Sequence, residues 1–148
     1  MIKSFIVANN PKLYYDYLVD KEIEAGVELL GNEVKSIRLY GLSIQNSFCV
    51  IKNMECWWQN VFIKNHLFSI DQDRPKRLLL KKSQIFSLYN SIKSCGGTIG
   101  VCKAYFNKDG FFKIIISFVK KKKIKDKREE LKKKDMERST RIYEKYQE

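Results

Sequence analysis

The sequence has little of what most catalytic and metal-binding sites are built from. It contains one histidine, His66, together with two prolines and four cysteines. The cysteines are far apart in the chain and none forms a CxxC pair: Cys49, Cys56, Cys95 and Cys102. Structural zinc sites bring their ligands in closely spaced pairs, so no zinc site is expected. We expect all four cysteines to be buried, reduced thiols of a protein in a reducing compartment.

Motifs for catalysis are missing too. The chain has no Gly-Lys-Ser phosphate loop and no Gly-x-Ser-x-Gly nucleophile turn. Its single imidazole, His66, lies in the polar segment from Lys64 to Lys76. This segment also contains Pro75, which is typical of a loop. We therefore expect a protein that is not an enzyme and that uses no cofactor or metal.

Long apolar runs are also absent. No stretch approaches the roughly 20 apolar residues that span a membrane. The segment from Met1 to Asn10 lacks the apolar core of a signal peptide. These absences predict a cytoplasmic protein that makes no membrane contact.

Positive charge is what the chain has in excess. Its 29 basic residues and 17 acidic residues leave a net charge of +12, and half of that net charge lies in residues 119–148. This segment holds thirteen basic and seven acidic side chains, with no glycine and no proline. Its few apolar residues are too irregularly spaced to form a packed helical face.

The composition of this segment nevertheless favours a helix once its charge is neutralised. Lysine, glutamate, arginine and leucine are all good helix formers. We therefore divide the chain into a globular domain, residues 1–118, and a basic tail, residues 119–148, that is disordered or conditionally helical. Such a tail is typical of an arm that binds nucleic acid.

The globular part has mostly the patterns of strands. In the clearest case, Ile23, Ala25 and Val27 alternate with polar residues. The Asp109-Gly110 pair predicts a hairpin turn, and a second hairpin is predicted around Met54 although its turn lacks glycine. The predicted strands are 16–30, 47–51, 56–63, 77–80, 98–106 and 111–119, and the predicted helices are 33–38 and one capped by Ser83 and ended by Gly96.

This order of elements predicts a mainly β fold. Short strands without strand–helix–strand alternation favour a small, OB-like antiparallel β-barrel with two to three short helices. Closure of the barrel would remove the exposed edges of an open six-stranded sheet.

The block from Gly31 to Arg38 is the strongest local signal for binding. Lys35 and Arg38 lie three residues apart on one short helix, so both project where phosphates can be reached. Val34 and Ile37 anchor the opposite side of the helix in the core. The alternative interpretation is an ordinary solvated helical face.

With this block, the sequence resembles the SsrA-binding protein (SmpB) family. That family carries an EAG triplet followed by GxEVKS(L/I)R, found here as Glu24 to Gly26 and Gly31 to Arg38. A DSYV-like segment, a basic R-x-R-K-L-L-L stretch and a DKR triplet follow in the same order, at 46–49, 74–80 and 126–128. The correct order and compatible spacing of these motifs make the resemblance specific.

The resemblance implies a role in the rescue of stalled ribosomes, called trans-translation. Family members bind the tRNA-like domain of transfer-messenger RNA (tmRNA, or SsrA) through the barrel. Their tail enters the empty mRNA channel of the ribosome near the decoding region of 16S rRNA and becomes helical. We expect this chain to do the same as a monomer.

By this resemblance, individual residues acquire expected roles. The expected RNA-binding face comprises Asn10, Tyr15, Tyr17, Glu24, Glu33, Lys35, Arg38, Arg74, Lys76, Arg77 and Lys81. The expected ribosome-binding part of the tail comprises Lys120, Lys121, Lys122, Lys123, Asp126, Lys127 and Arg128. A carboxylate on an RNA face must accept a hydrogen bond from a base or a 2′-hydroxyl, or orient a neighbouring cation. For Glu33 the alternative is an ion pair with a cation one helical turn away.

Three positions depart from the family pattern. Tyr15 replaces the usual histidine, which keeps an aromatic face for stacking but loses the imidazole. Lys81 replaces an asparagine and adds a cation to the expected RNA face. Lys121 replaces a glycine and removes a flexible joint from the root of the tail.

Two other functions stay open on the sequence alone. A general OB-fold single-strand RNA binder would bind unstructured RNA as tightly as a tRNA-like fold. A ribosome assembly protein would explain the basic tail equally well and would associate with ribosomes without tmRNA.

Asp126 generates a prediction, because an acid among so many lysines weakens attraction to phosphate. We interpret it as the N-cap of a helix that begins at Lys127. We expect Asp126→Ala to leave binding to free RNA intact while lowering tail helicity and peptide tagging on stalled ribosomes. Circular dichroism and a reconstituted translation assay measure the two effects, and unchanged tagging would refute the role.

Overall fold

The computed structural model describes residues 4–64 and 74–122 of the chain. In chain order the elements are β1 (Phe5–Asn9), α1 (Pro11–Asp16), β2 (Tyr17–Val27), α2 (Gly31–Tyr40), β3 (Leu42–Ser43), β4 (Phe48–Lys52), β5 (Glu55–Gln59), β6 (Phe62–Ile63), β7 (Lys76–Leu79), α3 (Lys82–Cys95), β8 (Thr98–Phe106) and β9 (Phe112–Lys121). The fold is mainly β, as predicted, and all its strand pairs are antiparallel.

The main sheet closes into a barrel. Its strands lie in the order β1-β8-β4-β5-β7-β2-β9. Because β8 also pairs with β9, the six strands from β8 to β9 form a closed ring. The β8–β9 ladder runs from the pair Thr98 and Val119 to the pair Phe106 and Phe112. The predicted closure is therefore confirmed, and β1 lies on the outside edge of β8.

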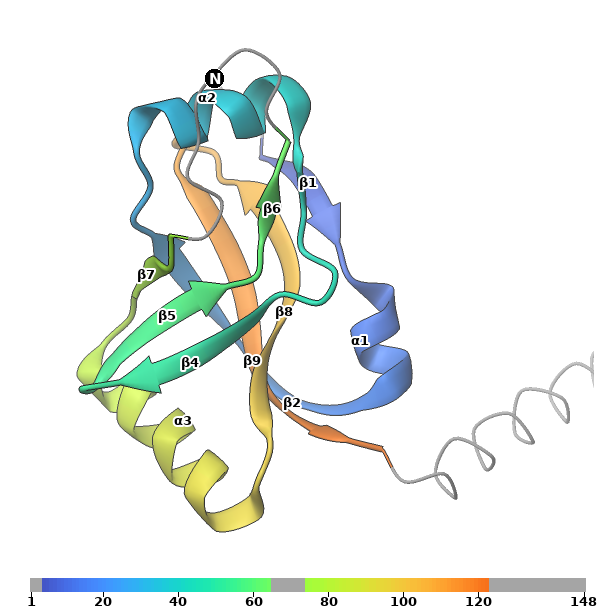
Figure 1. Cartoon of the computed structure of the whole chain (residues 1–148), viewed down its shortest axis with the longest axis vertical. Helices are drawn as coiled ribbons and strands as arrows, with labels where there is room; N and C mark the ends of the chain where they lie inside the picture. Colours follow the sequence, from blue (N-terminus) through green and yellow to red (C-terminus); the bar gives the residue numbers. More distant parts are fainter. Residues whose placement is uncertain (1–3, 65–73, 123–148) are drawn as a thin grey trace, which may run out of the picture.

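The helices lie around the barrel rather than within it. Figure 1 shows α2 across one end, α3 at the opposite end, and α1 beside the barrel at the turn from β1 into β2. Each of the two longer helices has a side-chain oxygen that accepts a hydrogen bond at its start. Glu33 Oε1 accepts from the Leu30 N–H at 2.9 Å, and Gln84 Oε1 accepts from the Lys81 N–H at 3.0 Å.

The barrel interior is filled by aromatic and branched side chains. Trp58 and Phe106 are each 1% exposed, and Phe112 contacts both rings. Ile99 of β8 and Ile114 and Ile116 of β9 belong to the same cluster. A smaller second cluster joins Leu13 of α1 to Cys102 and Val119. Burial on this scale, at about 25 cal/mol per Å² of apolar surface, is the main stabilising contribution to the fold.

Both predicted hairpins are present. The turn between β4 and β5 is made by Asn53 and Met54, with φ values of 53° and 59°. Asparagine adopts this left-handed conformation readily, whereas methionine does so only under the constraint of the surrounding ladder. The ladder, from Phe48 and Gln59 to Lys52 and Glu55, therefore replaces the missing turn glycine.

Other boundaries differ from the predictions. The N-terminal β1 and α1 and the short β3 were not predicted, although Pro11 at the first turn of α1 is a helix-start signal. The predicted strand 56–63 is divided into β5 and β6. Ser83 is not the N-cap of α3, because the helix begins at Lys82 and its N-cap is Lys81, two residues earlier than predicted. The last strand continues past the predicted end of the domain at 118 to Lys121, because β2 offers it pairing partners as far as Tyr17.

The start of β8 generates a stability prediction. A Cβ at Gly97 would lie 2.7 Å from the Val119 carbonyl oxygen and 2.9 Å from the Phe118 ring. We expect Gly97→Ala to lower the free energy of unfolding by about 1–3 kcal/mol, because backbone cannot move aside cheaply. Gly31→Ala is the control, since a Cβ there meets nothing within 4 Å. Urea denaturation measures both, and equal stabilities would contradict the packing argument.

Candidate nucleic-acid interface

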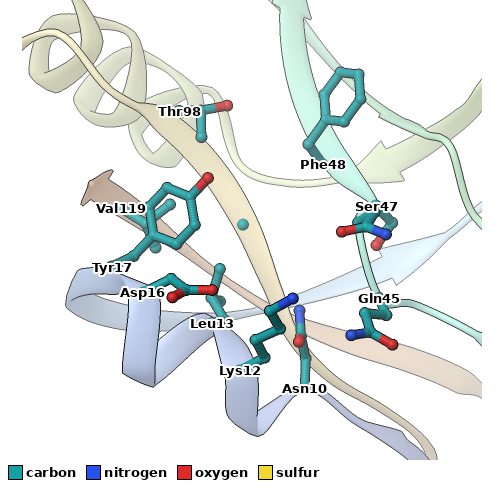
Figure 2. A pocket seen from close by; sticks show the side chains of 12 residues that line it. Asn10, Lys12, Leu13, Asp16, Tyr17, Gln45, Ser47, Phe48, Thr98 and Val119 are labelled. Carbon is teal, nitrogen blue, oxygen red and sulfur yellow. The ribbon is translucent and has the colours of Figure 1, made fainter. Parts of the chain in front are cut away.

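A cleft of about 320 Å³ lies on the outer surface of the barrel, between α1 and the start of β4. We call it the α1 cleft. Figure 2 shows its side chains arriving from three places: α1 with the first residue of β2, the loop before β4, and β8 with β9. It is lined by Asn10, Lys12, Leu13, Asp16, Tyr17, Gln45, Asn46, Ser47, Phe48, Thr98, Gly100 and Val119.

Asn10 fixes the α1 wall of this cleft to the barrel. Its side chain is 7% exposed and donates from Nδ2 to the Val101 carbonyl at 3.1 Å. Its backbone N–H donates to Cys102 at 2.9 Å, and its carbonyl accepts from Leu13 at 3.2 Å. Asn10 was predicted to line or support the RNA face, and it does border the α1 cleft while holding α1 in place.

The opposite wall is fixed by its own hydrogen bonds. The Ser47 hydroxyl donates to the Ile44 carbonyl at 2.6 Å, and the Ser47 N–H donates to the same oxygen at 3.0 Å. Asn46 adopts a φ of 69°, and its carbonyl accepts from Asn60 Nδ2 at 2.9 Å. The wall is therefore formed without a ligand.

Gly100 forms the floor. Phe48 and Gly100 are register partners, so the Phe48 ring faces a position that has no side chain. A Cβ at Gly100 would lie 2.8 Å from Leu13 Cδ1, because α1 packs directly on this stretch of β8. The absence of a side chain at Gly100 thus lets Leu13 of α1 pack directly on the barrel.

A second cleft, of about 740 Å³, lies between β2, β7 and the start of α3, and we call it the β7 cleft. Four of its lining residues are cationic and two are acidic: Arg77, Lys81, Lys82 and Lys113, with Glu24 and Glu55. Arg77 also pairs with Glu28 at 3.8 Å, and both side chains are about half exposed or more. The predicted Glu24, Arg77 and Lys81 are therefore brought together in a cationic cleft that attracts phosphate.

Glu24 is held in place on the outside of the barrel. The Tyr105 hydroxyl of β8 reaches across β9 and donates to Glu24 Oε2 on β2. Burial and the neighbouring carboxylate raise the pKa of Tyr105 above its usual value, so the phenol stays a donor at neutral pH. One carboxylate oxygen is thus anchored while the side chain as a whole stays exposed.

Glu33 and Lys76 do not reach the surface. Their side chains are 1% and 0% exposed, and Lys76 Nζ lies 3.6 Å from Glu33 Oε2. Arg74, which is 30% exposed, donates to Glu33 Oε1, so the Glu33 carboxylate is paired with two cations. The buried side chains of Glu33 and Lys76 do not lie on the surface where phosphate would be contacted, because a buried charge stays with its counter-ion. A role for Glu33 in supporting the RNA face through Arg74 stays a prediction. Glu33 is ion-paired, but with Arg74 and Lys76 of a distant segment, so the alternative of a partner one helical turn away is wrong.

The two cations of α2 remain on the surface. The Arg38 guanidinium lies 4.8 Å from the centroid of the Phe106 ring and donates to the Gly110 carbonyl at 2.8 Å. It therefore ties α2 to the β8–β9 turn. Lys35 is exposed on the same helix, and so is Tyr15 on α1. The expected roles of these three residues in binding RNA stay predictions.

The expected tail residues are only partly described. Lys120 and Lys121 lie in β9, opposite Leu18 and Tyr17 of β2, and both are exposed. Lys122 is 8% exposed, and its N–H donates to the Asp16 carbonyl at 3.0 Å. These three residues therefore belong to the barrel. The predicted contacts of Lys123, Asp126, Lys127 and Arg128, and the predicted loop at His66, lie outside the described residues.

Several residues of these clefts were not predicted. Lys12, Gln45, Phe48 and Thr98 come to the α1 cleft from separate segments, and the sequence gives no spacing that links them. Lys113 was also missed, although it stands beside the predicted turn at Gly110. Its ammonium lies 3.4 Å from where a Gly26 Cβ would be, so Lys113 borders the glycine of the EAG triplet.

Two further features limit the chemistry of the described part of the chain. Within residues 4–64 and 74–122, no group of three or more histidine, cysteine or acidic residues is arranged to hold a metal ion. None of the helices in these segments is long and apolar enough to cross a membrane.

Cys49, Cys56 and Cys102 are buried as predicted, and burial raises the pKa of Cys49. Cys95 is exposed at the end of α3, so the prediction for it is wrong.

The fold and the two clefts define a class of protein, a small antiparallel barrel with a basic surface of the kind that binds RNA. Comparison with known proteins makes the class specific, because residues 7–145 match the family described as SmpB protein. The chain belongs to the SmpB family.

Individual relatives agree along almost the whole chain. It is 41% identical to the SsrA-binding protein of Fervidobacterium nodosum, over 95% of this chain and 97% of that protein. It is 40% identical to the SsrA-binding protein of Streptococcus pyogenes, over 90% and 88% of the two chains. Among solved structures it is similar to a chain of "tmRNA-SmpB: a journey to the center of the bacterial ribosome", with a TM-score of 0.66, 30% identity, and coverage of 81% and 87%.

The buried ion pair generates a second stability prediction. We expect Glu33→Gln to lower the free energy of unfolding by about 3–5 kcal/mol, because it leaves the buried Lys76 ammonium without its counter-charge. Glu28→Gln is the matched control, since its pair with Arg77 is exposed and is worth about 0–1 kcal/mol. Denaturant titration measures both variants. Similar small losses in the two would show that Lys76 is compensated in another way.

Proposed function

We propose that this protein binds the tRNA-like domain of tmRNA and delivers it to stalled ribosomes. The observation that carries the proposal is the family match over residues 7–145, together with a structural neighbour taken from a complex of tmRNA and SmpB. Its relatives are named SsrA-binding proteins and are matched over nearly their full length.

The surface of the barrel supports this assignment. Exposed cations on three separated elements, with Lys35 and Arg38 on α2 and Lys81 at the start of α3 among them, suit a rigid, folded polyanion better than one extended strand. Side chains cannot read the deep major groove of A-form RNA, so recognition rests on shape, backbone and unstacked loop bases. Glu24 would then accept from a base N–H or a 2′-hydroxyl, with Tyr105 holding its second oxygen.

The barrel and the tail have different proposed partners, so the end of the barrel matters for assigning them. The barrel extends to Lys122, whose N–H is bonded to the Asp16 carbonyl. We propose that the residues of the predicted tail, 119–148, that follow Lys122 make the contacts with the ribosomal mRNA channel, because β9 itself continues to Lys121. Lys120 and Lys121 lie at the end of β9 and are exposed.

Competition binding tests the proposal. We expect the full-length protein to bind a tRNA-like tmRNA fragment at least about tenfold more tightly than an unstructured RNA of equal length. Log affinity should fall by about 0.7–0.9 per log unit of salt for each phosphate neutralised. Fluorescence anisotropy at several salt concentrations measures both quantities. The unstructured RNA is titrated at the same salt concentrations so that the two affinities can be compared.

The alternatives give different results. Equal affinity for both RNAs would identify a general single-strand RNA binder and refute the proposal. Recovery of ribosomal RNA without a structured small RNA, in a pull-down followed by RNA sequencing, would identify an assembly protein. One dominant structured small RNA in that pull-down is the outcome that the proposal requires.

A further inference from the structure

A group of buried polar side chains lies beneath α2, apart from the two clefts. Glu33 and Ser36 lie one turn apart on the buried side of α2 and are 1% and 0% exposed. Trp58 of β5 is 1% exposed and is the register partner of Lys76 on β7. Lys76 Nζ in turn lies 3.6 Å from Glu33 Oε2. The barrel therefore brings Trp58 to the same buried region as the inner side of α2.

The aromatic neighbours of Trp58 place its ring at the α2 end of the barrel. The indole stacks on Phe112 with 6.2 Å between the ring centroids, and Phe112 contacts Phe106 at 5.3 Å. The Arg38 guanidinium of α2 lies over the Phe106 ring, 4.8 Å from its centroid. Figure 1 shows α2 lying across this end of the barrel. The indole is thus held beneath the helix.

Four buried polar atoms of this group have no hydrogen-bond partner among the residues that the structure describes: Glu33 Oε2, Ser36 Oγ, Trp58 Nε1 and Arg74 Nε. Lys76 balances the charge of Glu33, but 3.6 Å exceeds the roughly 2.7–3.2 Å of an N–H···O hydrogen bond. Buried polar groups in folded proteins are nearly always bonded to protein atoms or to ordered water. The group therefore points to a bound molecule.

The mixture of donors and acceptors identifies this molecule as water. The indole of Trp58 and the Nε of Arg74 can only donate, whereas Glu33 Oε2 can only accept. The Ser36 hydroxyl can do either. Water complements this set, because it offers two donor and two acceptor sites. An anion would be repelled by the Glu33 carboxylate, and a metal cation would be repelled by the two cations that pair with it.

We propose that an ordered water molecule is bound beneath α2, where it accepts from Trp58 Nε1–H and donates to Glu33 Oε2, with Ser36 Oγ as its third partner. Three hydrogen bonds are typical of a buried water. The water links β5 to α2 and so helps to hold in place the helix that presents the exposed Lys35 and Arg38. Binding of water here does not require RNA, so it holds or fails independently of the proposed function.

The unmodified full-length protein supplies the first test, because its two tryptophans are the neighbours Trp57 and Trp58. Each gives one indole N–H signal in a nitrogen-15 NMR spectrum, and Trp57→Phe assigns the two signals. Trp57 is the internal control, since successive strand residues point to opposite faces and Trp57 is only half-buried. We expect cross-relaxation with a long-lived water at the Trp58 indole proton and not at that of Trp57. A Trp58 indole proton without this signal would refute the water site.

The variant Ser36→Ala tests the third partner. We expect the water signal at Trp58 to remain, because Glu33 still accepts from the water. The indole proton should exchange with solvent about three- to tenfold faster, as expected for the loss of one hydrogen bond. Ser117→Ala is the matched control and should leave this exchange unchanged, since Ser117 is also 0% exposed but its hydroxyl donates to the Phe118 carbonyl at 3.2 Å.

The contrary outcomes are equally distinct. Loss of the water signal in Ser36→Ala would show that the signal came from the serine hydroxyl, and equal exchange rates in the two serine variants would exclude Ser36 from the site. Either result contradicts the proposal. A high-resolution crystal structure gives the direct test: electron density for one water within hydrogen-bond distance of Trp58 Nε1 and Glu33 Oε2 is expected, and a dry site would overturn the proposal.

Discussion

The antiparallel pairing of β8 with β9 is the interaction on which the rest of this structure depends. It closes the barrel, and it covers the hydrogen-bonding edges that an open sheet would expose. The other edge of β8 is shared between β4 near its start and β1 near its end. One strand thus fixes the positions of the core, of the N-terminal strand and of the α1 cleft beside Gly100.

Charge in this protein has two separate uses, and burial distinguishes them. Glu33 and Lys76 are enclosed where α2 meets β7, so their charges are bound to each other and fix the position of the helix. The cations at the β7 cleft and on α2 are exposed, so they keep their attraction for a polyanion. The same family motif therefore contributes a structural glutamate, Glu33, and exposed basic residues such as Lys35, within one short helix.

Local patterns predicted the elements well where the local signal was strong. The alternation of Ile23, Ala25 and Val27 predicted β2, and the Asp109-Gly110 pair predicted the β8–β9 hairpin, because both features depend on residues close in sequence. Signals were weaker for β1, whose five residues gain their order from pairing with β8. The start of α3 was misplaced because the glutamine side chain at Gln84 accepts from Lys81, which makes Ser83 unnecessary as a cap.

By itself, the sequence determined the class of fold, the basic character of the chain and its family, because each of these is written in periodicity, composition or the order of short motifs. The tertiary structure alone decided which charged residues are accessible. Glu33 meets Arg74 across 41 positions, and Phe48 and Tyr17 line one cleft although they come from distant segments. Burial and the meeting of distant segments arise from barrel closure, which is a property of all the strands together and of no single segment.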